Sequence, residues 1–87
     1  MNYLKFDLGL LNSDRIVEVT LRGDAANVRL LDNSNFFSYT RGKTYNSLGG
    51  LAKTSPITFT IPTRDHWYVV VDMVGLQGKP DASVKIH

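Results

Sequence analysis

Apolar and polar residues alternate with a period of two along most of this chain, and this pattern limits what it can fold into. In residues 3–9, YLKFDLG, apolar side chains alternate with Lys5 and Asp7. The same spacing recurs in four other segments, residues 15–23, 27–32, 56–62 and 82–86. Because successive side chains of a strand point to opposite faces, each segment predicts a half-buried β-strand.

A nearly continuous apolar segment, WYVVVDMVG, follows His66. Such a run is typical of a central strand that is covered on much of both faces. We expect its first residue to be largely buried and one face of the strand to carry Trp67, Val69, Val71 and Met73.

Glycines and polar residues in the middle of the chain predict two less regular features. Gly49 and Gly50, with residues 43–48 before them, favour a tight hairpin. Asn35 can cap a helical turn and Gly42 can end it in the left-handed conformation. The six residues between them fit barely more than one turn.

About seven short, mostly antiparallel strands and one helical turn after Asn35 predict an all-β fold. The spacing of turn residues favours a small β-sandwich, with a small closed or partly open barrel as the alternative. A chain of 87 residues suffices for one hydrophobic core, so we expect a single domain over residues 1–87.

Composition excludes several classes of protein. The chain has no cysteine, which removes disulfides, thiolate nucleophiles and cysteine-based metal centres. Lys5 and Asp7 interrupt the apolar residues near the N-terminus, unlike a signal peptide, and no window approaches the roughly 20 apolar residues of a membrane span. We therefore expect a soluble, cytoplasmic protein of bacterial type with no membrane partner.

Catalysis is not indicated by the candidate residues. His66 is the only histidine before the C-terminal residue, and Ser55, Asp65 and Asp72 are its conceivable partners. Adjacent residues of a strand face opposite ways, so Asp65 is poorly placed to orient His66. We expect a protein that is not an enzyme.

Metal and nucleotide sites are not indicated either. The aspartates are dispersed, and the glycines match neither GxxxxGK[ST] nor GxGxxG, so we expect no cofactor and no metal. Asp72 is unusual because it lies within VVVDMV, where a buried charge is expensive unless it is hydrogen-bonded. We expect it to face outward or to cap backbone amides of a neighbouring loop.

The segment SNFFSYTRGK, residues 34–43, gathers aromatic and basic side chains. On a helical turn Phe36 and Tyr39 project to one side, where they can close over the sheet as core residues. Phe37 points elsewhere, with Arg41 four residues further along. The candidate contact surface is therefore made of Phe37, Arg41, Lys43 and Tyr45.

These four residues can also stack bases and follow phosphates, as in proteins that bind single-stranded nucleic acid. The net charge is only +2, from ten basic and eight acidic residues, and the other basic residues are spread along the chain. This balance argues against nucleic acid as the partner.

One set of spaced residues resembles a small bacterial domain family of unknown function. The set covers the chain from about Asn27 to the end and includes Asn35-Phe36, Tyr39, Gly42, Tyr45, Gly49-Gly50, Ser55-Pro56, Ile61-Pro62, His66-Trp67, Val71-Asp72, Gly75, Gly78 and Ala82-Ser83-Val84. In that family the domain occurs alone or N-terminal to Toll/interleukin-1 receptor (TIR) domains. The resemblance implies no active site, and it implies a sensing, binding or assembly role in a signalling or defence system.

Taken together, the residues and the resemblance predict a non-enzymatic interaction or ligand-sensing module with an unknown protein or small-molecule partner. Loops at one end of the sandwich would form the contact surface. The alternative is a structural domain that forms homo-oligomers through a sheet edge, either the last strand with Lys85 or residues 57–61.

Overall fold

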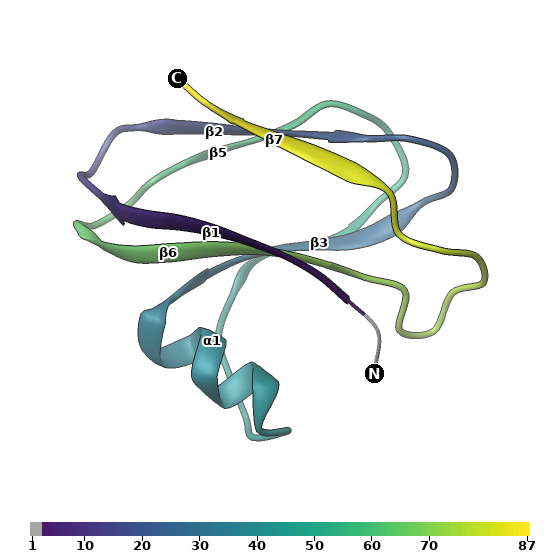
Figure 1. Ribbon diagram of the computed structural model, residues 1–87, viewed down its shortest axis with the longest axis horizontal. Coiled ribbons are helices and arrows are strands. Elements are labelled where there is room, and N and C mark those ends of the chain that lie inside the picture. The colour runs from purple at the N-terminus through teal and green to yellow at the C-terminus, as the bar shows by residue number, and fades with distance from the viewer. Residues whose placement is uncertain (1–2) are drawn as a thin grey trace.

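Seven strands and one helix form three layers (Figure 1) in the computed structural model, which describes residues 3–87. The first sheet, called sheet A, has the order β1-β6-β3-β4, and the second, sheet B, has the order β5-β2-β7. Helix α1 covers the outer face of sheet A. The bounds are β1 Tyr3–Leu11, β2 Ile16–Leu21, β3 Ala26–Asp32, α1 Asn33–Thr40, β4 Leu48–Ala52, β5 Ile57–Thr60, β6 Asp65–Asp72 and β7 Ala82–Ile86.

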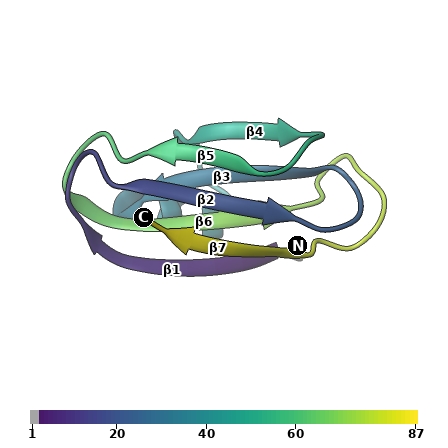
Figure 2. The same ribbon diagram turned by 90° about the horizontal axis from the view of Figure 1, so that it is seen from above.

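All strand pairings are antiparallel, and the two sheets pack face to face as a sandwich that is not closed into a barrel. Figure 2 shows β4 and β5 along one side of the sandwich and β1 and β7 along the other. The predicted all-β sandwich is confirmed. Both strands that the sequence suggested as sheet edges, β5 and β7, are the outer strands of sheet B.

Strand β6 is the centre of sheet A, with β1 on one side and β3 on the other. Its inner face carries Trp67, Val69 and Val71, which join the core between the sheets, and Met73 packs against the same core. The outer face contributes Tyr68 and Val70 to a second cluster beneath α1. The prediction of a strand covered on both faces is therefore confirmed.

Helix α1 begins earlier than the sequence suggested. Asp32, not Asn35, is the N-cap residue: its side chain accepts a hydrogen bond of 3.0 Å from the Asn35 backbone N–H. Asp32 is the last residue of β3 and the first of four consecutive polar residues that can cap a helix, and it is this first residue that caps α1. Gly42 lies beyond the helix with a φ of 70°, as predicted for a left-handed ending.

Packing of α1 separates its aromatic side chains as predicted. Phe36 and Tyr39 are buried against sheet A, whereas Phe37 is 41% exposed. Phe36 stacks on Tyr68 with ring centroids 3.9 Å apart. The helix thus closes the outer face of the sheet with two of its three aromatic rings.

The predicted hairpin at Gly49 and Gly50 is wrong, because both glycines lie inside β4 and pair with β3. Gly49 has a φ of 89°, and a Cβ there would lie 2.3 Å from the Val28 carbonyl oxygen and 2.9 Å from the Phe59 ring. Glycine at this position permits close approach of the strand to its neighbours rather than a turn.

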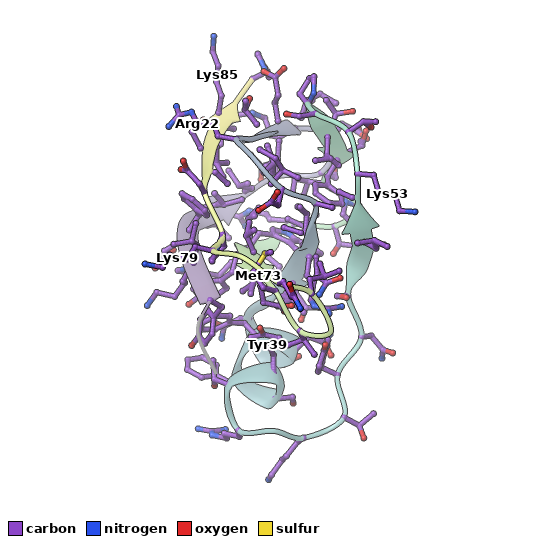
Figure 3. All side chains as sticks on the ribbon, turned by 90° about the vertical axis from the view of Figure 1, so that its right-hand side faces the viewer. Arg22, Tyr39, Lys53, Met73, Lys79 and Lys85 are labelled. Carbon is purple, nitrogen blue, oxygen red and sulfur yellow. The ribbon has the colours of Figure 1, made fainter. Side chains whose placement is uncertain are left out.

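Asp72 is fully buried, so the expectation that it faces outward is wrong. Its carboxylate accepts hydrogen bonds from Asn27 Nδ2 at 2.8 Å, from Arg29 Nε at 3.1 Å and from the Tyr39 hydroxyl at 2.8 Å. It also accepts from the backbone N–H of Val74, as the alternative expectation required. Figure 3 shows Tyr39 between α1 and sheet A, where this network joins the helix to the sheet.

The electrostatics of this network favour a charged Asp72 beside a neutral Tyr39. Burial alone opposes the carboxylate, but the hydrogen bonds from Asn27, Tyr39 and Arg29 outweigh it, and the pKa of Asp72 lies below its ordinary value. Burial, with the hydrogen bond to Asp72, raises the pKa of Tyr39 well above its ordinary value. The charge of Asp72 is thereby paired and solvated by protein groups.

Candidate functional site

A cleft of about 250 Å³ opens at the end of the sandwich where β3 passes into α1. Strand pairing brings its floor together, because Asp32 is opposite Trp67 and Leu30 is opposite Leu48. We call it the Asp32 cleft, and its lining consists of Leu30, Asp32, Asn35, Asn46, Ser47, Leu48, Pro62, Thr63 and Trp67.

The apolar wall of the Asp32 cleft is held rigidly. Trp67 is 5% exposed, and its indole Nε1–H donates a hydrogen bond of 2.9 Å to the carbonyl oxygen of Thr63. That bond fixes the turn after Pro62 against the indole. Leu48, which is 44% exposed, forms the outer part of the wall.

The polar wall is built around the capping carboxylate. Oδ1 of Asp32 accepts from the Asn35 backbone N–H, from Asn35 Nδ2 at 2.9 Å and from the Ser34 hydroxyl at 3.4 Å. Asn35 Oδ1 in turn accepts from the Asn46 backbone N–H at 2.9 Å, which attaches the loop after α1 to the helix. No residue within 3–87 donates to Oδ2 of Asp32, and none forms an ion pair with this carboxylate.

The four residues of the predicted contact surface do not form one continuous surface. The Arg41 guanidinium lies 5.4 Å from the Phe37 ring centroid on the exposed side of α1, and Lys43 is exposed beyond the helix. Tyr45 is half-buried and packs edge to face on Tyr39 with centroids 5.1 Å apart. The structure therefore brings Phe37 and Arg41 together and places Tyr45 against the buried cluster beneath α1.

The imidazole ring of His66 contacts none of the catalytic partners that the sequence suggested. Its Nε2 lies 2.6 Å from Asp7 Oδ1, and its ring stacks on Tyr68 with centroids 4.8 Å apart. The backbone N–H of Gly9 and the His66 ring hold the pKa of Asp7 below its ordinary value. The imidazole thus belongs to a surface pair on the outer face of sheet A.

The other conceivable catalytic partners of His66 are engaged elsewhere. Ser55 Oγ accepts a hydrogen bond of 2.9 Å from the Leu21 backbone N–H. Asp72 is buried in its own network, and Asp65 accepts from the backbone N–H of His66 rather than from its ring. Within residues 3–87, no three His, Cys, Asp or Glu side chains gather as metal ligands do.

Sequence reasoning missed the Asp32 cleft because its lining comes from four separate segments. Asp32 was considered only among dispersed aspartates, and Trp67 only as a core residue. The usable signal was the run Asp32 to Asn35, in which four successive residues that can cap a helix stand where a strand ends. Such a run places polar groups at the end of a sheet.

Comparison with known proteins identifies the family and nothing more specific. In the part of the chain that the structure describes, no helix has the length and apolar character needed to span a membrane. Neither a curated protein nor a solved structure matches the chain significantly. A family model does match, over residues 1–87, and so extends beyond the region from Asn27 in which the resemblance was noted. The chain belongs to this family, DUF1883, a domain of unknown function.

Proposed function

We propose that the domain is a non-enzymatic binding module and that the Asp32 cleft is its ligand site. One observation carries the proposal: a preformed cleft with apolar walls contains a fixed carboxylate oxygen that no described residue engages. Small-molecule sites commonly combine apolar walls with a few placed polar groups. The volume of about 250 Å³ suits a small metabolite.

The chemistry of the lining supports binding rather than turnover. Asp32 is the only titratable side chain among the nine lining residues, and neither the hydroxyl of Ser47 nor that of Thr63 donates a hydrogen bond to this potential base. A nucleophile needs such a base within hydrogen-bond reach. Resemblance to domains that occur N-terminal to TIR domains further supports a sensing role in signalling or defence.

Trp67 provides a direct test because it is the only tryptophan of the chain and lines the cleft. We expect at least one compound of a small-metabolite library to change its fluorescence emission and to raise the melting temperature in proportion to ligand concentration. The control is Phe37→Ala, which leaves the cleft untouched. Turnover of a compound that is lost in His66→Ala would contradict the proposal, as would a complete absence of ligands.

Self-association is a second candidate, favoured by the free edge of β4. Strands β1 and β7 carry charged residues, and one of these, Lys85, points outward in Figure 3. Strand β5 has a proline on each side, Pro56 and Pro62. Such features protect sheet edges from pairing. Strand β4 has no charged residue, and its exposed side chains include Leu48 and Leu51, of which Leu51 lines a groove of about 490 Å³.

A second copy of the chain can pair with this edge in antiparallel fashion. A two-fold axis at Gly50 would place Leu48 of one copy opposite Ala52 of the other, without opposing like charges. We expect light scattering after size exclusion to show a dimer that Leu51→Lys converts to a monomer. A monomer at high protein concentration would remove this candidate.

A further inference from the structure

We infer that the Asp32 cleft selects a small organic cation, an alkylammonium with a short hydrocarbon body. This inference rests on the proposed function and adds the chemical class of the ligand. It follows from the charge of the lining, from the way the carboxylate is held, and from the number of acceptors around it.

The charge of the cleft is negative, and no cationic side chain in the described part of the chain pairs with it. Asp32 is the only charged lining residue, and the ion pairs of residues 3–87 involve other acids, namely Asp7, Glu18, Asp72 and Asp81. A positively charged ligand would therefore pair with the half-buried Asp32 carboxylate. Water and salt screen this attraction less than they screen the attraction of a fully exposed acid.

The carboxylate is also fixed in direction. Three donors hold Oδ1, so the position of Oδ2 relative to the cleft is set before a ligand arrives. A fixed acceptor avoids part of the ordering entropy that binding would otherwise require. The same arrangement disfavours anions, because the N-terminus of α1, which could attract them, is already occupied by Asp32.

The remaining lining matches an alkylammonium in number and kind of groups. An ammonium has three N–H donors. Besides Asp32 Oδ2, the hydroxyls of Ser47 and Thr63 and the side-chain amide of Asn46 form no hydrogen bond with any described residue. The hydrocarbon body then meets Leu48, Pro62 and the Trp67 wall.

Three probes with the same isobutyl body and different head groups test the inference: isobutylamine, isobutanol and isovalerate. Binding is followed by Trp67 fluorescence and by the NMR signal of its indole N–H. At neutral pH we expect isobutylamine to bind at least about tenfold more tightly than either other probe, since hydrogen bonds to charged groups are the stronger ones. Equal or tighter binding of isobutanol or isovalerate would overturn the inference.

Asp32→Asn removes the charge while keeping an N-cap residue that can still accept from the Asn35 N–H. We expect this variant to fold and to bind isobutylamine at least about tenfold more weakly. Asp81→Asn is the matched control, because it changes the net charge equally at an exposed residue away from the cleft, and we expect unchanged affinity. Unchanged affinity in Asp32→Asn would refute the role of the carboxylate.

A second matched pair tests the apolar wall without touching the cap. Leu48→Ala should weaken isobutylamine binding severalfold. Leu51→Ala should not, because Leu51 is also an exposed leucine of β4 but does not line the cleft. If isobutylamine fails to bind while a neutral or anionic library compound perturbs Trp67, the ligand class is wrong and the binding module stands. If no compound of any charge perturbs Trp67, both proposals fall.

Discussion

Replacing Asp72 with alanine should lower the free energy of unfolding by about 3–5 kcal/mol, the range for breaking a buried ionic network. The change removes an acceptor that the Arg29 guanidinium, the Tyr39 hydroxyl and the Asn27 amide share, although the amide keeps its hydrogen bond to the Val74 carbonyl oxygen. Because small domains are stable by only about 5–15 kcal/mol, much of the total stability is lost. Urea denaturation followed by circular dichroism measures the effect.

Asp81→Ala serves as the control, because Asp81 is exposed and its contact with Arg22 is long, 3.9 Å. It should change stability by less than about 1 kcal/mol. Acid provides a second check: since the pKa of Asp72 is lowered by folding, its stabilising effect is complete above the unfolded value of about 4 and disappears as the pH falls below it. Equal stability of Asp72→Ala and Asp81→Ala would contradict the stabilising role of the Asp72 network.

Phe36→Ala should cost about 3–5 kcal/mol, whereas Phe37→Ala should cost about 0.5 kcal/mol or less. Phe36 is buried and stacked on Tyr68, whereas Phe37 is 41% exposed and makes an edge contact with the Phe36 ring. Both residues lie in α1, so the gain in helix propensity on substitution is the same and cancels in the comparison. Thermal and urea unfolding of the two variants provide the measurement.

The nucleic-acid interpretation of the Phe37 and Arg41 pair is tested with the same variant. If Phe37 and Arg41 bound single-stranded nucleic acid, Phe37→Ala would weaken that binding without loss of stability. The affinity would also fall steeply as the salt concentration rises. A similar loss of stability in Phe36→Ala and Phe37→Ala would instead show that the two rings share one environment.

Most of the fold could be predicted because alternation is a local property. Each half-buried strand carries its own pattern, and the apolar run of β6 identifies the strand between two layers. The predicted hairpin was wrong because glycine occurs both in turns and at positions in strands where a neighbouring segment approaches closely. Gly49 and Gly50 have the sequence of a turn, but the close approach of Val28 and Phe59 explains the glycine at position 49.

The candidate site could not be predicted in the same way because it depends on contacts between distant residues. Asp32 becomes part of a cleft only when β3 pairs with β6 and with β4, which brings Trp67 and Leu48 beside it. Sequence reasoning could state the energetic problem of a charge at Asp72, but its donors come from β3, α1 and the segment after β6. Local pattern does not specify such partners.

The burial of β6 on both faces also has a consequence for the unfolded chain. Residues 67–71, WYVVV, combine strong β-propensity with no charge and no proline, the composition of segments that form intermolecular β-structure. In the folded domain, α1 and sheet B cover both faces of this segment, and β1 and β3 occupy both edges. Asp65 and Asp72 stand at its ends as charged gatekeepers against aggregation. Substitutions that detach α1 or β1 therefore expose the most aggregation-prone part of the chain, and loss of soluble protein in the cell is their expected first symptom.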